Sequence, residues 1–291
     1  MEDQFLILLN GLSFAMLLFL VSVGFTLQFS VLGVLNLAHG SFYMLGVFLA
    51  ITVAMFMGNY AGNFWIGLLL APLLVAAFGA FLEWSLLRRI YIRDVLFQYL
   101  FTYTWILIID DLVLMIWGAR YSIISLPPIF SAPVNFLGVT FSSYRLFIIL
   151  LGLLVAGLLW FFLQKTKAGM IVRAASVNRE MVGALGVNTP LLFTAVFALG
   201  AWLAGVGGVL VAPLQTAYAG MGLDIIVDCF IVVVIGGMGS IKGAFWAALT
   251  LGMLRAFGIA YVPQVEMALS YLLMAVILII RPRGFFGREE A

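Results

Sequence analysis

Few side chains in this sequence are of the types that carry out chemistry. The 291 residues include one histidine, His39, and one cysteine, Cys229, so no intrachain disulfide and no cysteine-type metal site can form. A membrane-embedded enzyme would need His, Asp or Glu at set spacings, such as H-E-x-x-H, and the sequence has no such motif. It also lacks the G-x-x-x-x-G-K-[ST] loop that binds nucleotide phosphates. We therefore expect no catalytic residue, no metal site and no cofactor bound by this chain.

The composition indicates where the chain resides. Hydrophobic residues make up 65% of the sequence and charged residues only 9%, and the mean hydropathy is +1.23. Soluble domains carry about 25% charged residues. The composition predicts an all-α, polytopic integral membrane bundle, folded as a single transmembrane domain over residues 1–291 and surrounded by membrane lipid. The net charge of +2 is small and scattered, which argues against binding to nucleic acid.

The basic residues lie in short clusters between long apolar stretches. A helix of about 20 apolar residues crosses a bilayer, and we predict about nine spans, with eight to ten as the range. Loops rich in Lys and Arg stay in the cytoplasm. An odd number of crossings places the acidic N-terminus outside, the C-terminus in the cytoplasm, Arg120 and Arg145 outside, and Arg255 within a span. The predicted spans are 5–26, 31–57, 62–87, 95–117, 144–164, 191–212, 225–239, 243–261 and 265–281. The basic residues predicted to be cytoplasmic are Arg88, Arg89, Arg93, Lys165, Lys167, Arg173, Arg179, Lys242, Arg281, Arg283 and Arg288.

Four charged residues fall inside predicted spans: Asp110, Asp111, Asp228 and Arg255. Charges at membrane depth are costly, so each is expected to have a partner or a water-filled surrounding. Asp111 and Arg255 each lie six residues from the outer end of their spans (117 − 111 and 261 − 255), at a similar depth. We rank Asp111 or Asp110 first as the partner of Arg255 and Asp228 second. A solvated Arg255 is the alternative, and the two adjacent acids could instead face a vestibule or contact a partner subunit.

Two spans are interrupted by glycine-containing segments, N-L-A-H-G-S at 36–41 and I-G-G-M-G-S at 235–240. Unwound backbone at membrane depth survives only where protein or a water-filled cavity surrounds it. Such interruptions in corresponding positions of two halves are typical of a transport pathway. The other interpretation is that the glycines permit close helix packing. We expect broken or re-entrant helices near 36–41 and 236–240.

The longest hydrophilic segment, residues 165–190, is predicted to lie in the cytoplasm as two short helices. Asn178 is suited to cap the start of a helix at 179–185, and Gly186 is suited to a left-handed conformation at its end. So short a helix is unstable alone and must dock onto something. It could dock onto a partner protein, or it could be an amphipathic connector resting on lipid headgroups.

Several segments together resemble a known family. They are N-L-A-H-G-S-F-Y-M-L-G, the loop G-M-I-V-R-A-A-S-V-N-R-E-M-V-G-A-L-G-V-N, the run A-G-V-G-G-V-L, V-V-I-G-G-M-G-S-I-K-G-A and the closing R-P-R-G-F-F-G. In this order, from Gly11 to Gly287, they are similar to the permease subunits of bacterial branched-chain amino acid ABC importers. The similarity is greater to the subunit that pairs with a second, related permease than to ribose-type relatives that pair with themselves.

The resemblance implies partners that the sequence itself does not contain. A second permease, two cytoplasmic ATP-binding subunits that hold ATP and Mg, and a periplasmic solute-binding protein are expected. The chain is expected to be a multi-pass protein of the bacterial inner membrane, with a periplasmic N-terminus and a cytoplasmic C-terminus. The solute remains undetermined, since relatives carry branched-chain or other amino acids, urea, amides or small carboxylates.

The resemblance also implies roles for individual residues. Those matched to the segment that couples the permease to its ATPase are Gly169, Arg173, Ala174, Asn178, Glu180, Ala184, Leu185, Gly186 and Asn188. Candidates for the translocation path are Asn36, His39, Ser41, Gly236, Gly237, Gly239 and Ser240. For His39, a structural hydrogen bond to a backbone carbonyl competes with solute contact. An ion-coupled secondary transporter acting alone would also explain broken helices and buried acids, but not a cytoplasmic helix of docking size.

Overall fold

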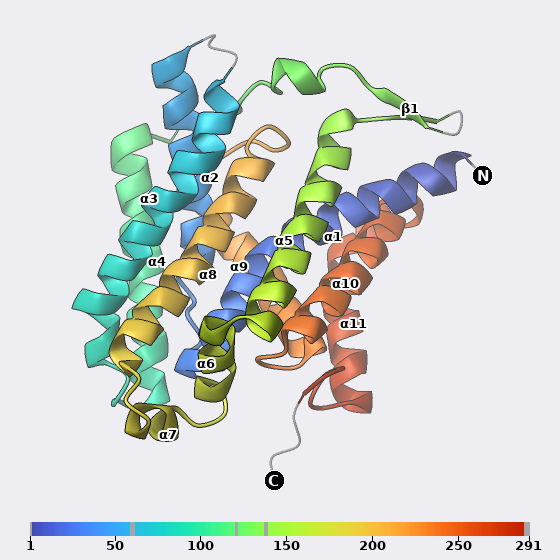
Figure 1. Ribbon diagram of the computed structural model, residues 1–291. Coiled ribbons are helices and arrows are strands. Elements are labelled where there is room, and N and C mark those ends of the chain that lie inside the picture. The colour runs from blue at the N-terminus through green and yellow to red at the C-terminus, as the bar shows by residue number, and fades with distance from the viewer. Residues whose placement is uncertain (1, 59–61, 120–121, 137–138, 288–291) are drawn as a thin grey trace.

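The structure is a computed structural model that describes residues 2–58, 62–119, 122–136 and 139–287 (Figure 1). Eleven α-helices occupy this part of the chain, together with a short β-hairpin of β1 (Val134–Phe136) and β2 (Val139–Phe141). The helices are α1 (Glu2–Leu32), α2 (His39–Met57), α3 (Asn63–Ser85), α4 (Val95–Trp117), α5 (Ser143–Lys165), α6 (Lys167–Ala175), α7 (Arg179–Ala184), α8 (Thr189–Val211), α9 (Met221–Gly236), α10 (Ile241–Tyr261) and α11 (Glu266–Ile280). The predicted all-α membrane bundle is confirmed.

Seven helices in the described ranges are long and apolar enough to cross a membrane: α1, α2, α3, α4, α5, α8 and α10. The predicted spans at 225–239 and 265–281 correspond to α9 and α11, which have 16 and 15 residues. At 1.5 Å per residue these helices are roughly 24 and 22 Å long, less than the ~30 Å hydrocarbon thickness of a bilayer. The nine predicted spans therefore match nine helices in order, but two of these helices are short.

The predicted span at 31–57 is wrong in one respect. α1 runs on past residue 26 and stops at Gly33, whose φ of +69° takes the chain out of the helix. Residues 33–38 are not helical, and α2 starts at His39, inside the segment where an unwound helix was expected. Because the apolar composition continues across this break, hydrophobicity alone could not place the end of α1.

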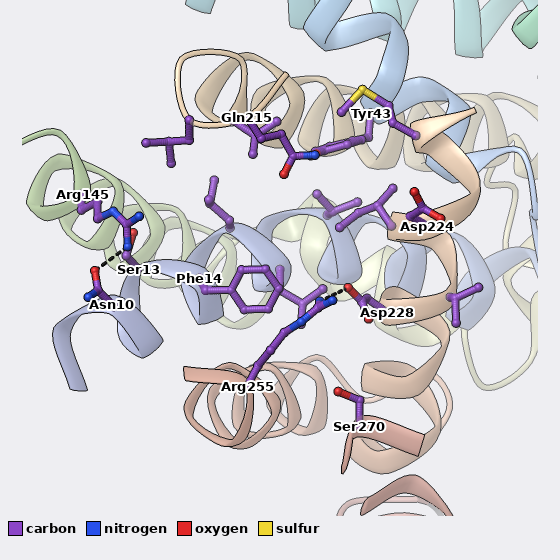
Figure 2. A pocket seen from close by; sticks show the side chains of 18 of the residues that line it. Asn10, Ser13, Phe14, Tyr43, Arg145, Gln215, Asp224, Asp228, Arg255 and Ser270 are labelled. Atoms are coloured by element: carbon purple, nitrogen blue, oxygen red, sulfur yellow. Dashed lines mark hydrogen bonds and ion pairs between the residues drawn. The ribbon is translucent and has the colours of Figure 1, made fainter. Parts of the chain in front are cut away.

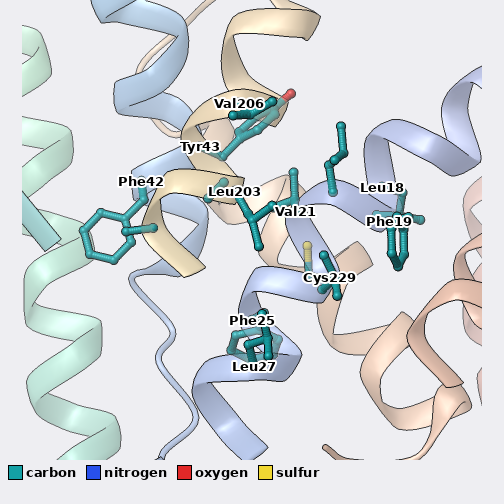
Figure 3. Close-up of a cluster of buried hydrophobic side chains, with 14 of the residues drawn as sticks. Leu18, Phe19, Val21, Phe25, Leu27, Phe42, Tyr43, Leu203, Val206 and Cys229 are labelled. Carbon is teal, nitrogen blue, oxygen red and sulfur yellow. The ribbon is translucent and has the colours of Figure 1, made fainter. Parts of the chain in front are cut away.

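The centre of the bundle is built around α1, which packs against α5, α8, α9 and α10. Figure 3 shows part of this core, where Val21 and Phe25 of α1 lie near Leu203 of α8 and Cys229 of α9. All four side chains are fully buried. The single cysteine is therefore a core side chain.

The first turns of α2 and α9 come into close backbone contact. A Cβ atom on Gly222 would lie 2.9 Å from the carbonyl carbon and oxygen of Gly40, a separation that side chains do not tolerate. Glycine at these positions lets the two backbones approach. The start of α2, directly after the first break, thus packs against the start of α9.

The loops divide between two ends of the bundle (Figure 1). The N-terminus and β1 lie at one end, whereas α6, α7 and the C-terminal segment lie at the other. The three Arg residues at 88, 89 and 93 follow α3 and precede α4, at the same end as α7. The basic loops thus gather at one end of the bundle, and their cytoplasmic orientation remains a prediction.

This orientation is testable by labelling single cysteines in a Cys229→Ala background. Ile92, Val177 and Ile129 are 89%, 70% and 70% exposed, so each position is open to a reagent. In inside-out and right-side-out vesicles, Ile92→Cys and Val177→Cys should react only from the cytoplasm, and Ile129→Cys only from outside. Reaction of all three from the same side would disprove the predicted topology.

Candidate functional site

A cavity of about 490 Å³ opens between α1, α9, α10, α11 and the segment that follows α8. It lies near the first residue of α5, toward the end of the bundle that holds the N-terminus. Its wall combines apolar side chains of α1 and α9 with a group of polar ones. The polar residues drawn in Figure 2 are Asn10, Ser13, Tyr43, Arg145, Gln215, Asp224, Asp228, Arg255 and Ser270. This volume falls within the ~300–1,000 Å³ usual for small-molecule sites.

Arg255 of α10 contacts side chains of three other helices on one side of this cavity. Its Nη1 lies 2.5 Å from Asp228 Oδ2 of α9, and its Nε donates to Glu266 Oε1 of α11. The guanidinium carbon also lies 5.0 Å from the centre of the Phe14 ring on α1, a cation–π arrangement. Arg255 is therefore paired with two carboxylates at the cavity wall.

The pairing ranked first from the sequence, of Arg255 with Asp111 or Asp110, is wrong. Both acids lie on α4, which packs on α2, whereas Arg255 lies on α10, which packs on α1, α9 and α11. Depth along a helix says nothing about which helices are neighbours. Asp111 is exposed at the surface of the bundle, and within the described ranges Asp110 Oδ1 is buried without a hydrogen-bond partner. Asp228, ranked second, is a true partner, and Glu266 is an additional one.

Two further charged residues in the cavity, Asp224 and Arg145, form hydrogen bonds but no ion pair with the residues that the structure describes. Asp224, in the first turn of α9, accepts a hydrogen bond from the Tyr218 hydroxyl. Arg145 of α5 donates from Nη1 to the Asn10 amide oxygen. Within the described ranges, no ion pair within 4.0 Å forms at either residue. The cavity therefore presents one carboxylate and one guanidinium, each hydrogen-bonded but not paired with an opposite charge in the described ranges, to a molecule that enters it. We call these two groups free in this sense.

The first break, at 33–38, is held by polar side chains buried in the core. His39 is 0% exposed, and its Nε2 donates to the Val21 carbonyl at 2.9 Å. Asn36 Nδ2 donates to Gln28 Oε1 at 3.1 Å, and Gln28 Nε2 donates to the Phe197 carbonyl at 3.0 Å. None of these side chains lines the cavity. The geometry favours the structural role weighed for His39, and Ser41 is likewise buried, at 1% exposure.

The second break, at 237–240, is held by the chain's own C-terminal segment. Phe285 N donates to the Ile235 carbonyl at 2.8 Å, and Phe286 N donates to the Gly236 carbonyl at 3.0 Å. Gly237 and Gly239 have φ of +95° and +82°, which side-chain-bearing residues rarely adopt. Ser240 caps α10 by accepting a hydrogen bond from Gly243 N. The predicted interruption near 236–240 is confirmed, and its carbonyls are hydrogen-bonded within the protein.

The segment 165–190 folds as the two predicted short helices, α6 and α7. Asn178 Oδ1 accepts from Met181 N at 2.9 Å, and Gly186 has φ +85°, as expected for the two ends of α7. α7 ends at Ala184, one residue earlier than predicted. Asn188 caps α8 by accepting from Leu191 N.

The segment joins rigidly to α5 and projects an apolar surface. Gly169 packs so closely on Phe162 and Leu163 of α5 that no Cβ fits there. Arg173 donates to Gln164 Oε1 at 3.0 Å, and Ala174, Glu180 and Ala184 are exposed. The most exposed apolar side chains are Val177, Met181 and Leu185, at 70%, 63% and 78%. An apolar surface beyond the end of the bundle is suited to contact with a protein partner.

Over residues 7–281 the sequence matches the family of permease components of the branched-chain amino acid transport system. The chain belongs to this family. It is 28% identical over 298 residues to the high-affinity branched-chain amino acid transport system permease protein BraD of Pseudomonas aeruginosa, covering 97% of this chain and 95% of BraD. It is 27% identical over 311 residues to LivH of Escherichia coli, covering 100% of this chain and 99% of LivH. A probable LivH of Methanocaldococcus jannaschii is 27% identical over 305 residues, covering 97% and 92%.

The fold of this permease also occurs among solved structures. It is similar to a chain in the structure of PsaBC from Streptococcus pneumoniae in complex with Fab, with a TM-score of 0.50 and 12% identity. The match covers 93% of this chain and 89% of that chain. At this identity the likeness concerns the fold alone.

One polar cluster of the permease was not found from the sequence. Glu83, near the end of α3, is 0% exposed and accepts hydrogen bonds from Thr194 Oγ1 at 2.5 Å and Tyr91 Oη at 3.1 Å. Arg88 Nη2 lies 3.3 Å from Glu83 and donates to the Pro190 carbonyl at 2.9 Å. Burial next to Glu83 raises the pKa of the Tyr91 hydroxyl, which keeps it a donor. This Glu83 cluster joins the end of α3 to the start of α8, directly after α7. The sequence did contain one signal for this cluster: an acidic residue at the end of an apolar stretch, five residues before an arginine.

The Glu83 cluster should stabilise the permease through Arg88 and not through the adjacent Arg89. Arg88→Ala leaves the fully buried Glu83 without its counter-charge, whereas Arg89 is exposed and its side chain makes no hydrogen bond or ion pair in the described ranges. Removing a partner from a buried ion pair is strongly destabilising. Thermal unfolding of the purified protein in detergent should show a midpoint several degrees lower for Arg88→Ala, at roughly 2–4 °C per kcal/mol lost. Equal midpoints for Arg88→Ala and Arg89→Ala would disprove a stabilising role for the cluster.

Proposed function

We propose that this chain forms one side of the translocation path for an amino acid in an ATP-driven importer, working by alternating access with a second, related permease. The observation that supports it most directly is the cavity that contains a free carboxylate, Asp224, and a free guanidinium, Arg145. Family membership and relatives named for branched-chain amino acid transport point to the same solute class.

The charges of the cavity suit a zwitterion. An α-amino acid carries one ammonium and one carboxylate, and a low-dielectric site binds each only if it supplies the opposite charge. Asp224 and Arg145 lie on opposite sides of the cavity in Figure 2, so they would pair with the solute at different points of its passage, Asp224 with the ammonium group and Arg145 with the carboxylate. The apolar wall, which includes Leu17, Leu18 and Ile225, can surround an aliphatic side chain.

We expect the exposed helix α7 to transmit the movement of the ATP-binding subunits to the permease. Two cytoplasmic ATP-binding subunits, which would hold ATP and Mg, would contact α7 through Met181, Leu185 and the flat surface at Ala184. Because α7 leads directly into α8, and the Glu83 cluster fixes α8 to α3, displacement of α7 would move both helices together. A periplasmic binding protein would deliver the solute at the opposite end. In this proposal the chain resides in the inner membrane, with its N-terminus in the periplasm and its C-terminus in the cytoplasm.

A charge at Ala184 should separate transport from assembly. Ala184→Glu places a carboxylate on the exposed surface of α7 without disturbing the core, because Ala184 is itself exposed. Uptake by the reconstituted importer should fall at least tenfold while the amount of inserted protein stays near that of the native chain. The matched control is Ala132→Glu, an exposed alanine at the other end of the bundle.

Full transport by Ala184→Glu would disprove the docking role of α7. Co-purification of the chain with ATPase subunits supports an importer. Uptake by this chain alone in liposomes, driven by an ion gradient, would instead make it a secondary transporter.

The free charges should determine which solutes the importer moves. Asp224→Asn should weaken uptake of an amino acid by about tenfold or more while sparing the corresponding 2-hydroxy acid, which has no ammonium group. Arg145→Gln should weaken uptake of both, because both carry the carboxylate. Asp94→Asn, an exposed acid outside the cavity, is the control. Competition with labelled leucine in proteoliposomes measures each effect, and an unchanged preference in Asp224→Asn contradicts recognition at this carboxylate.

A further inference from the structure

A second cavity, of about 680 Å³, lies at the opposite end of the bundle from the first. It is bounded by the last turns of α1, the end of α5, α6 and the turn between α9 and α10. Figure 1 shows α6 and the start of α10 close together at this end, near the C-terminal segment. The predicted topology places this end in the cytoplasmic leaflet.

The second cavity lies on a different side of α1 from the solute cavity. Leu17 lines the first cavity and Phe19 the second, and residues two apart on a helix point about 200° from one another. Ser30, eleven residues after Phe19, returns to the same face and also lines the second cavity. The second cavity is therefore separated from the solute cavity by the body of α1.

The charges that line this cavity are all positive. Arg173 of α6 and Lys242 of α10 line it, and no Asp or Glu is among its described lining residues. Arg173 donates to the neutral amide of Gln164, and Lys242 forms no ion pair within the described ranges. Both side chains are exposed to the cavity mouth. Two cations that form no ion pair with any described residue favour an anion here.

Most of the remaining wall is apolar or aromatic. Trp160 lies five residues before the end of α5 (165 − 160), and Trp246 lies five residues after the start of α10 (246 − 241). At 1.5 Å per residue, both indoles lie about 7.5 Å in from the helix ends. Each is 52% exposed. Tryptophan at this depth is typical of the boundary between headgroups and acyl chains.

We propose that this cavity binds an anionic phospholipid of the cytoplasmic leaflet. The phosphate contacts Arg173 and Lys242, and the acyl chains lie along Trp160 and Trp246. Basic pockets between membrane helices on the cytoplasmic side recognise lipid headgroups in this way. The apolar wall is what distinguishes a lipid from free phosphate, because phosphate alone would gain nothing from the two tryptophans. The proposal does not depend on which solute the permease carries.

Lipid retention on the purified full-length chain tests the site directly. Native mass spectrometry in mild detergent would compare phosphatidylglycerol with phosphatidylcholine of the same acyl chains, and with inorganic phosphate alone. Phosphatidylglycerol should be retained most, and the double variant R173Q/K242Q should lower its apparent affinity about tenfold or more. The control R93Q/R179Q removes two exposed cytoplasmic cations that do not line the cavity, and it should leave the affinity unchanged.

Charge-conserving and aromatic variants separate binding from folding. R173K/K242R keeps both charges and should keep the affinity, whereas W160A/W246A should weaken phosphatidylglycerol and leave any phosphate binding as it was. Equal retention of the two lipids, an unchanged R173Q/K242Q variant, or phosphate alone binding as tightly as the lipid would each overturn the proposal.

Discussion

In the hydrocarbon core of a bilayer, no water is available to the backbone groups that a broken helix leaves unpaired. This architecture therefore depends on hydrogen bonds from within the protein to the backbone at each break. The chain meets it twice with different means. At the first break, Gly33 N donates to the Phe29 carbonyl and His39 N to the Asn36 carbonyl, while the buried side chains of Gln28, Asn36 and His39 bond to one another and to carbonyls of α1 and α8. At the second, backbone amides of Phe285 and Phe286 bond to the end of α9. No residue of either break lines the first cavity, and residues of both line the second one.

Charge is distributed unequally between the two ends of the molecule. The first cavity is lined by charges of both signs: Arg255 is paired with Asp228 and Glu266, and Asp224 and Arg145 form no ion pair in the described ranges. Among the described residues, the charged ones that line the second cavity are the cations Arg173 and Lys242. Mixed charge suits a ligand that is neutral overall and must leave again, whereas a uniformly positive site suits a resident anion.

Local features of this permease were predictable from sequence, and contacts between distant helices were not. The cap at Asn178 and the left-handed Gly186 depend on a few neighbouring residues, and both were predicted correctly. The partners of Arg255 depend on which helices are adjacent, so matching depth led to Asp111 on the wrong helix. The Glu83 cluster was not predicted because the hydrogen-bond donors to Glu83, Thr194 and Tyr91, come from separate segments of the chain. The end of α1 was misplaced because an apolar run hides a break that only the conformation of Gly33 marks.

The closure of the second break by residues 285–286 also sets an order of events during synthesis. The carbonyl of Ile235 receives its donor from Phe285, a residue made fifty positions later (285 − 235). When α9 and α10 first enter the membrane, the turn between them lacks these two donors. The nascent chain must keep this turn near water or a membrane insertase until the last helix has been delivered. A chain that ended after α10 would lack both donors, and the carbonyls of Ile235 and Gly236 would then depend on water.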